Sequence, residues 1–370
     1  MRIGCPKEIK PQEYRVGLTP ESAAELVRAG HSVWIEAGAG LGIGAGDERY
    51  VQIGAQIAPD AKAVFEAAEM IVKVKEPQAQ ECAMLRPEQT LFTYLHLAPD
   101  PAQAQALMRS GATAIAYETV TDAHGRLPLL KPMSEVAGRM SIQVGANFLE
   151  KTHGGRGVLL GGVPGVRPAD VVILGAGVAG YNAAQIAVGM RARVTVFDKN
   201  PTRLEELDRE FNGRLETVYS TRAAVEAAVM EADLVIGAVL VPGAAAPRLI
   251  TRDMLKTMRP GAVLVDISID QGGCFETSRA TTHHDPVFVV DGVIHYCVAN
   301  MPGAVARTSA FALNNATLPF TLELANKGVQ RALHENPHLA EGLNVCAGAI
   351  AHPAVARDLG LACARPAWLA

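Results

Sequence analysis

The 370 residues are long enough for two domains, because one domain takes roughly 150 residues. Hydrophobic residues make up 49% of the chain and charged residues 19%, which is typical of a soluble globular protein with large buried cores. The formal net charge of −4, without a basic stripe interleaved with aromatic residues, argues against nucleic acid as the main partner.

Two further features indicate a cytoplasmic protein without a membrane partner. The first eight residues lack the apolar core of a signal peptide, and six scattered cysteines without a C-x-x-C pair are typical of reduced thiols. Residues 171–190 carry no charge, as in a membrane span, but they include four glycines, Asn182 and Gln185. We therefore interpret this run as a βα unit buried in a parallel sheet.

Strands alternate with helices in the first third of the chain, which predicts a parallel, doubly wound sheet. A helix should begin after Thr19, with Thr19 as its cap and Pro20 in its first position. The charged segment 7–16 is expected to lie outside the core. The expected strands are 2–4, 31–35, 70–74, 90–95 and 112–116, and the expected helices are 19–29, 61–68 and 101–109.

The second part of the chain repeats this alternation after an interruption at 128–133. A helix is expected to begin at Ser134 and to run toward Leu149, and Asp291-Gly292 predicts a type I′ hairpin turn. The expected strands are 171–174, 193–197, 218–219, 233–240, 262–266, 287–290 and 293–296, and the further helices are 178–190, 202–210, 221–231, one from Thr251 and one over 304–327.

These elements predict an α/β fold with two doubly wound Rossmann-like domains joined by long helices. Residues 1–129 plus 304–370 are expected to form a discontinuous substrate (catalytic) domain, and residues 134–303 an NAD-binding domain. Ligands of such sheets bind at the carboxyl ends of the strands, so we expect the active cleft between the two domains.

The motif Gly175-Ala-Gly177-Val-Ala-Gly180 follows an apolar strand and opens a helix. Its first glycine permits a tight turn, the second lets the backbone approach a pyrophosphate, and the third lets helix and strand pack closely. Asp198 ends the next strand 23 positions after Gly175, near the roughly 20 expected for an acid that binds a ribose. This context predicts dinucleotide binding; the alternative is a tight βα turn without a ligand.

Polar residues after predicted strands are the candidates for chemistry. His96 ends an apolar strand and is suited to proton transfer, or it is a hydrogen-bonded structural histidine. Lys75 and Arg15 could bind a carboxylate, or they are ordinary surface cations. Asp270, before a glycine pair, orients water or an amine or caps the next segment, whereas Asp266 is interpreted as structural.

Several segments give the chain a resemblance to the bacterial L-alanine dehydrogenase family, within the wider alanine dehydrogenase/pyridine nucleotide transhydrogenase group. The resemblance covers essentially the whole chain. The segments that carry it are 6–8, 13–20, Val74-Lys-Glu-Pro77, Leu95-His-Leu-Ala98, Lys131-Pro-Met-Ser-Glu-Val-Ala-Gly-Arg139, Asp266-Ile-Ser-Ile-Asp-Gln-Gly-Gly273 and Asn300-Met-Pro-Gly-Ala-Val305.

The resemblance implies reversible oxidation of L-alanine by NAD to pyruvate and ammonium, usually in a homohexamer. In that family, residues matching Arg15 and Lys75 hold the substrate carboxylate, His96 is the acid/base, and Asp270 assists at the water or amine. Asp198 should favour NAD over NADP, although Lys199 and Arg203 lie nearby. The expected cofactor contacts are Ser134, Gly175, Gly177, Val178, Ala179, Gly180, Asp198, Arg203, Ser220, Val239, Leu240, Ile267, Ser268, Ile269, Asp270, Val298, Ala299, Asn300 and Met301.

Some family members are described with a metal held by a Glu and a His four positions later. Here Glu323 is followed by Lys327, so no such metal site is expected. Competing interpretations are the NAD(H)-binding soluble subunit of a proton-translocating transhydrogenase, a non-catalytic NAD sensor, and a lysine-pathway dehydrogenase with a larger substrate. Turnover without a partner protein separates the first two from an alanine dehydrogenase.

Overall fold

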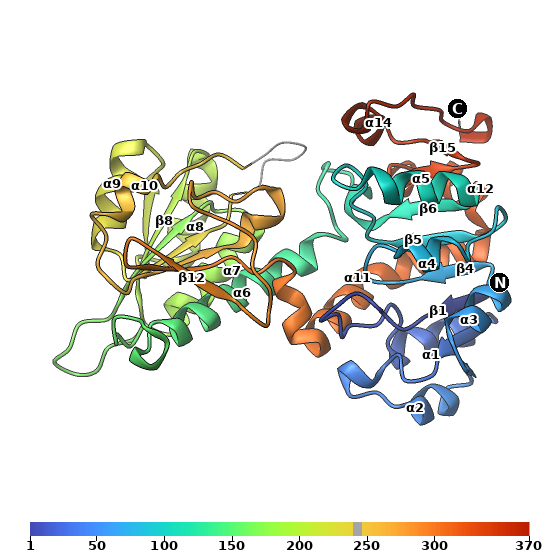
Figure 1. The fold of residues 1–370 in the computed structure, drawn as a ribbon, viewed down its shortest axis with the longest axis horizontal. Helices are drawn as coiled ribbons and strands as arrows, with labels where there is room; N and C mark the ends of the chain where they lie inside the picture. The colour runs from blue at the N-terminus through green and yellow to red at the C-terminus, as the bar shows by residue number, and fades with distance from the viewer. Residues whose placement is uncertain (240–245, 370) are drawn as a thin grey trace. The chain divides into compact units, whose positions relative to one another are not determined.

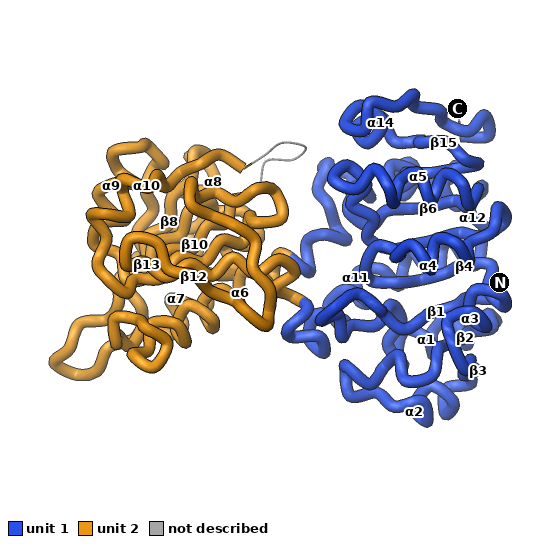
Figure 2. The backbone as a smooth tube through the Cα atoms, in the orientation of Figure 1, with its two compact units in different colours: residues 1–133, 303–370 blue, residues 134–302 orange. Residues whose placement is uncertain are grey.

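The computed structural model describes residues 1–239 and 246–369. The chain forms two compact units, which Figure 2 shows in different colours. Unit 1 comprises residues 1–133 and 303–370, and unit 2 comprises residues 134–302. Each unit is built around its own sheet.

Unit 1 contains an eight-stranded sheet in the order β15-β14-β6-β5-β4-β1-β2-β3. Its strands are β1 (Arg2–Cys5), β2 (Ser32–Glu36), β3 (Gln56–Ala58), β4 (Met70–Val72), β5 (Thr90–Thr93), β6 (Thr113–Ala116), β14 (Leu343–Cys346) and β15 (Ala349–Ile350). Strands β1 to β6 pair in parallel, and Gly4 of β1 lies between Trp34 and Ile71. Strands β2 and β3 lie on one side of β1, whereas β4, β5 and β6 lie on the other side. The strand order therefore reverses between β1 and β4.

Helices accompany this sheet (Figure 1), and its apolar side chains are buried. Helix α1 begins where predicted, because Thr19 Oγ1 accepts the Ser22 N–H at 3.3 Å and Pro20 occupies the first turn. The helices of unit 1 are α1 (Pro20–Arg28), α2 (Asp47–Gln52), α3 (Ala61–Ala67), α4 (Ala79–Cys82), α5 (Pro101–Ser110), α11 (Ala306–Lys327), α12 (Val329–Glu335), α13 (Pro337–Ala340) and α14 (Pro353–Leu359), with short 3₁₀ turns η1 (Leu41–Ile43), η2 (Tyr117–Thr119) and η6 (Ala367–Leu369).

The C-terminal strands were not predicted from the sequence. Strand β14 pairs antiparallel with β6, and β15 pairs antiparallel with β14. Their side chains Val345 and Ile350 join the same core as Leu91 and Ala114. Such short strands carry little local signal, and β6, the partner of β14 in the main sheet, lies more than two hundred residues earlier in the chain.

Unit 2 contains a seven-stranded sheet in the order β12-β13-β11-β10-β7-β8-β9. Its strands are β7 (Asp170–Leu174), β8 (Arg193–Asp198), β9 (Glu216–Tyr219), β10 (Leu234–Gly237), β11 (Val263–Asp266), β12 (Val287–Val290) and β13 (Val293–Tyr296). Its helices are α7 (Val178–Gly189), α8 (Pro201–Phe211), α9 (Arg222–Glu231) and α10 (Arg252–Leu255), with η3 (Lys151–His153) and η4 (Ile267–Gln271). The strand order reverses between β7 and β10, as it does between β1 and β4 in unit 1.

The predicted α/β fold with two parallel-dominated, Rossmann-like sheets is confirmed, and so is the hairpin of β12 and β13, whose turn residues Asp291 and Gly292 both have positive φ. Several predicted boundaries were wrong by two or three residues, among them those of α6 (Lys131–Phe148) and β10. Helix α6 begins three residues before Ser134, because Pro132 fits the first turn of a helix. Strand β10 ends at Gly237, whereas 233–240 was predicted, and Leu240 lies outside the described residues.

The helix α11 is followed in the chain by α12 and preceded by the 3₁₀ turn η5 (Met301–Val305). Although α11 has 22 residues, its sequence is too polar for a lipid core. Among the described residues, we find no helix with both the length and the apolar character needed to cross a membrane.

His295 makes the stability of unit 2 depend on pH. Its ring is fully buried on β13, with Nδ1 3.0 Å from the carbonyl oxygen of Val293 and Nε2 2.7 Å from Thr277 Oγ1. Burial lowers the pKa of His295 below its ordinary value of 6.5. The unfolded chain therefore takes up a proton that the folded chain rejects, and the free energy of unfolding decreases as the pH falls through about 6.5.

We predict that the melting temperature of the chain decreases between about pH 7.5 and about pH 5.5, and that His295→Gln removes part of this decrease. Thermal unfolding of both chains at the two pH values measures the effect. An identical pH dependence in both chains would contradict the prediction.

Candidate active site

In unit 1, the predicted residues Lys75 and His96 lie at one edge of the sheet. Lys75 follows β4 and His96 follows β5, and the carboxyl ends of these neighbouring parallel strands meet at the same edge. Arg15 lies in the loop that follows β1, the other neighbour of β4. This edge includes the point where the strand order reverses, which is where ligands bind in open α/β sheets.

Arg15 is held by Glu13 through a bidentate ion pair. Arg15 Nε lies 2.7 Å from Glu13 Oε1 and Nη2 lies 2.6 Å from Oε2, and the Arg15 backbone N–H donates to Oε1 at 3.0 Å. Both side chains are at most 2% exposed. Burial alone would lower the pKa of Arg15, but the hydrogen bonds and charge of Glu13 outweigh it and raise that pKa. The guanidinium is therefore a fixed, permanently charged group rather than a surface cation.

The backbone of His96 is strained and is held by Glu118. His96 has φ +47°, in the left-handed region that residues other than glycine seldom adopt. The Glu118 carboxylate accepts the His96 N–H at 2.6 Å and the Leu95 N–H at 3.1 Å, and its Oε1 lies 3.9 Å from His96 Nδ1. The imidazole stacks on Tyr94 with ring centroids 5.7 Å apart and stays 43% exposed. This geometry leaves the ring accessible to a ligand.

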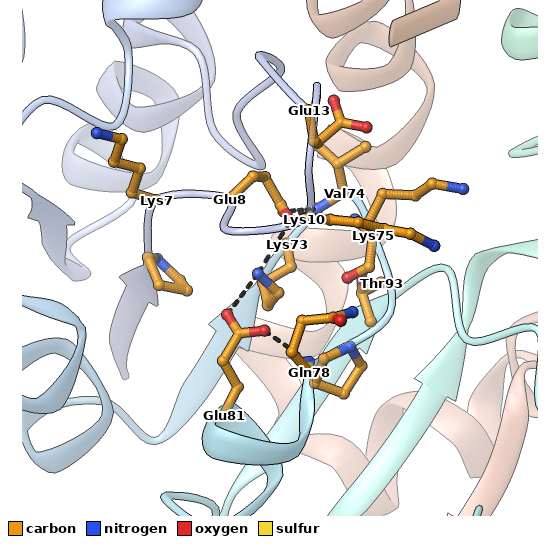
Figure 3. A network of polar contacts seen from close by, with 12 residues as sticks. Lys7, Glu8, Lys10, Glu13, Lys73, Val74, Lys75, Gln78, Glu81 and Thr93 are labelled. Carbon is orange, nitrogen blue, oxygen red and sulfur yellow. Dashed lines mark hydrogen bonds and ion pairs between the residues drawn. The ribbon is translucent and has the colours of Figure 1, made fainter. Parts of the chain in front are cut away.

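Lys75 begins a turn whose backbone is fixed on both sides (Figure 3). Its N–H donates to Glu8 Oε1 at 3.4 Å, and its carbonyl oxygen accepts from Thr93 Oγ1 at 3.0 Å. Its ammonium lies 3.8 Å from Glu76 Oε2, and Lys10 pairs with the other oxygen of Glu76. Burial raises the pKa of Glu76, but the two lysines outweigh this and lower it.

In unit 2, the glycine turn has the shape that a dinucleotide pyrophosphate requires. Gly175 has φ +99°, and a Cβ there would lie 2.7 Å from the carbonyl oxygen of Ala238. A Cβ at Gly180 would collide with the carbonyl oxygen of Gly175, whereas a Cβ at Gly177 would meet no atom within 4 Å. Gly177 also forms the N-cap of α7 without a side chain, and the N–H groups of a helix's first turn suit a phosphate.

Asp198 ends β8 and binds the backbone of this turn. Its Oδ2 accepts the Ala176 N–H at 2.7 Å and its Oδ1 accepts the Asn200 N–H at 2.8 Å. Arg203 Nε donates to the carbonyl oxygen of Ala176 at 2.8 Å, and the N–H of Ser220 donates to the Asp198 carbonyl at 2.9 Å. The predicted residues Asp198, Arg203 and Ser220 are thus brought together with the glycine turn.

The turn η4 places the predicted residues Ile267, Ser268, Ile269 and Asp270 after β11. Ser268 Oγ donates to the carbonyl oxygen of Val239 at 2.7 Å, which connects η4 to the end of β10. Asp270 is exposed. Leu240, also predicted to contact the cofactor, lies outside the described residues.

The carboxylate of Asp266 holds η4 and the loop after it. Oδ1 accepts the Ser268 N–H at 3.0 Å, and Oδ2 accepts the Cys274 N–H at 2.9 Å and the Ser278 hydroxyl at 2.5 Å. Burial raises the pKa of Asp266, and these hydrogen bonds offset part of that increase. The interpretation of Asp266 as structural is consistent with these contacts.

The remaining predicted cofactor contacts lie on two other segments of unit 2. Val298 and Met301 are buried, whereas Ala299 and Asn300 are half-buried. Asn300 has φ +63°, and its carbonyl oxygen lies 3.0 Å from His283 Nε2. Ser134 is half-buried on α6.

Sequence reasoning missed the acidic residues that position these groups. It placed segment 7–16 outside the core, yet Glu8, Glu13 and Arg15 are at most 7% exposed. The expectation was wrong because these charges neutralise one another inside unit 1, which composition does not reveal. The Glu13-x-Arg15 spacing was visible in the sequence, but Glu118 carried no local signal, since its partner His96 lies 22 residues away.

The fold and the glycine turn are those of a two-unit enzyme that uses a pyridine nucleotide. Family models of the N-terminal and C-terminal domains of alanine dehydrogenase/PNT match residues 4–137 and 141–353. The chain therefore belongs to the alanine dehydrogenase/PNT family.

Individual relatives cover nearly the whole chain. The alanine dehydrogenase of Halomonas elongata is 60% identical over 98% of this chain and 97% of its own. An L-alanine dehydrogenase structure is 55% identical, with a TM-score of 0.95, and covers 97% of this chain and 99% of that one. A transhydrogenase structure from Sinorhizobium meliloti is 27% identical, with a TM-score of 0.82, over 96% of this chain and all of that one. The predicted family and an amino-acid dehydrogenase activity are confirmed.

On α11, Glu323 and Lys327 occupy the positions of the Glu and His that are described as metal ligands in some family members. Here these two residues belong to a cluster of ion pairs. Lys327 Nζ lies 2.8 Å from Glu323 Oε1 and 3.0 Å from Glu335 Oε2. Within residues 1–239 and 246–369, no group of three or more His, Cys, Asp or Glu side chains is arranged to hold a metal ion. The absence of a metal site stays a prediction.

We predict that Glu13→Ala lowers the free energy of unfolding of unit 1 by about 3–5 kcal/mol, because it removes the carboxylate that forms a bidentate ion pair with the buried Arg15. The matched control is Glu25→Ala, which removes an exposed pair with Arg28 and should change stability by less than about 1 kcal/mol. Urea unfolding followed by tryptophan fluorescence measures both, since both tryptophans, Trp34 and Trp368, lie in unit 1. Equal effects of the two substitutions would contradict the assignment of a buried pair.

Proposed function

We propose that this chain catalyses the reversible oxidative deamination of L-alanine with NAD, giving pyruvate, ammonium, NADH and a proton. Family membership supports an amino-acid dehydrogenase, and the site residues give the more detailed proposal. The observation that carries it is the edge of the unit 1 sheet, where Arg15, Lys75 and His96 follow three neighbouring strands.

In this proposal, Arg15 and Lys75 bind the substrate carboxylate. The guanidinium is held in place by Glu13, so it can present a fixed N–H array, and Lys75 adds a second positive charge from the end of β4. Two fixed cations suit a small monocarboxylate. Holding the carboxylate at both groups leaves Cα with one defined orientation, and such positioning can lower a barrier by several kcal/mol.

His96 and Asp270 transfer protons in the proposed mechanism. When bound, a nicotinamide would supply the hydride acceptor for Cα, so that the substrate amine would become an iminium group. Water then adds to that carbon, and the resulting carbinolamine loses ammonia after a proton moves from oxygen to nitrogen. His96, exposed and stacked on Tyr94, and Asp270, exposed on η4, are the groups proposed to accept and return these protons.

We further propose that the pyridine nucleotide is NAD rather than NADP. The Asp198 carboxylate at the end of β8 would repel a 2′-phosphate. Arg203, which lies nearby, is bound to the carbonyl oxygen of Ala176 and to Glu206 at 2.7 Å. Lys199 remains a nearby positive charge.

The domain roles follow from the same argument: unit 2 is proposed as the NAD-binding part and unit 1 as the substrate-binding part. From the family resemblance, we also propose a homohexamer that acts in the cytoplasm. These proposals concern assembly and location, and the chemistry above does not depend on them.

The test is a spectrophotometric assay of the purified chain with L-alanine and NAD⁺, repeated with NADP⁺, L-lysine and L-glutamate. We predict NADH formation with L-alanine, far slower reaction with NADP⁺, and a loss of about 10²-fold or more in His96→Ala and Asp270→Asn. NADH binding measured by fluorescence should persist in both variants. Intact NADH binding without any turnover would contradict the proposal and favour a transhydrogenase-like subunit, since this chain is also similar to the transhydrogenase structure from Sinorhizobium meliloti.

A further inference from the structure

Three buried charges in unit 1 take no part in the proposed chemistry. Lys73 Nζ lies 3.0 Å from Glu8 Oε2 and 2.7 Å from Glu81 Oε1, and all three side chains are at most 2% exposed (Figure 3). Glu8 comes from the loop after β1, Lys73 from the end of β4, and Glu81 from α4. The triad therefore joins three elements at the point where the strand order reverses.

A buried triad of charges contributes little to stability by itself. Removing charges from water is costly, and apolar side chains of similar size often stabilise a protein as well or better. Burial alone would lower the pKa of Lys73, but the two carboxylates outweigh it and raise that pKa, so the ammonium stays charged. The remaining contacts of the two carboxylates indicate what else the triad does.

Each carboxylate uses its other oxygen to hold one end of the turn that carries Lys75. Glu8 Oε1 accepts the Val74 N–H at 2.7 Å and the Lys75 N–H at 3.4 Å. Glu81 Oε2 accepts the Gln78 N–H at 2.8 Å. Lys73 thus bridges two carboxylates that bind the turn at its beginning and at its end.

We propose that Glu8, Lys73 and Glu81 form a clamp whose role is to position Lys75 for the substrate carboxylate. The three are positioning residues, and the inference rests on the proposed function of Lys75. With its N–H held by Glu8 and its carbonyl oxygen by Thr93, Lys75 has a fixed backbone from which its ammonium extends. Without the clamp, the Lys75 ammonium would no longer be held where it can bind the substrate carboxylate.

The test is a double-mutant cycle between Glu8 and Lys75 on the full chain, measuring KM for pyruvate and KM for NADH in the presence of ammonium. We expect Glu8→Ala to raise the pyruvate KM about tenfold, as loss of a charge-assisted hydrogen bond does, with the NADH KM within about twofold. In the Lys75→Met background, Glu8→Ala should change the pyruvate KM by less than about twofold, because the clamp acts through Lys75.

Glu36→Ala is the matched control. Its carboxylate accepts a backbone N–H at 2.7 Å, from Lys7, but it does not bind the turn that carries Lys75. It should leave both KM values within about twofold of the wild type. If Glu8→Ala does not fold, Glu8→Gln replaces it: the amide keeps one acceptor oxygen, so an intermediate increase of about threefold is expected, again only when Lys75 is present.

The clamp is overturned if the pyruvate KM does not change, if it rises equally in both backgrounds, or if the NADH KM rises in parallel. These results require a wild type that reduces pyruvate. A wild type that does not do so would contradict the proposed function, and the positioning role would fall with it, so the two failures are distinguishable.

Discussion

Carboxylates that accept backbone N–H bonds hold the loops at the carboxyl ends of both sheets. A parallel strand ends with N–H groups that the ladder no longer pairs, and buried groups of this kind must find another acceptor. A carboxylate supplies a bond roughly twice as strong as a neutral one. The pairs are Glu8 with Val74 and Lys75, Glu118 with Leu95 and His96, Asp198 with Ala176, and Asp266 with Ser268 and Cys274.

The two sheets share the same order of their first strands, but the candidate residues at their edges differ. In both units the strand order reverses beside the first strand, β1 or β7, and the candidate residues follow that strand and its neighbours. Unit 2 leaves open space beside Gly177, which suits a phosphate. Unit 1 fills the equivalent edge with paired charges, among them Arg15 with Glu13 and Lys73 with Glu8. The side chains of the loops, rather than the sheets, decide what each edge binds.

The sequence predicted those features that a short segment determines. The glycine turn, Asp198 at the end of β8, the Thr19 cap and the Asp291-Gly292 hairpin each depend on a few adjacent residues, and each is found where predicted. The alternation of strands and helices likewise predicted the two α/β sheets.

The features that were missed depend on residues far apart in the chain. Segment 7–16 is polar, and only the folded unit shows that Glu8 meets Lys73, 65 residues later. Strands β14 and β15 are too short to be predicted without β6 beside them. The contact of Glu118 with His96 belongs to the same class. Candidate residues could thus be named from the sequence, but the groups that position them could not.

The central claim is that this chain alone transfers a hydride from the Cα of L-alanine to a nicotinamide. The most direct measurement is the mass of the NADH formed from NAD⁺ and L-alanine deuterated at Cα, with no other protein present. The account predicts that each NADH carries one deuterium. NADH without deuterium, or NADH that forms only after a second protein is added, would contradict it.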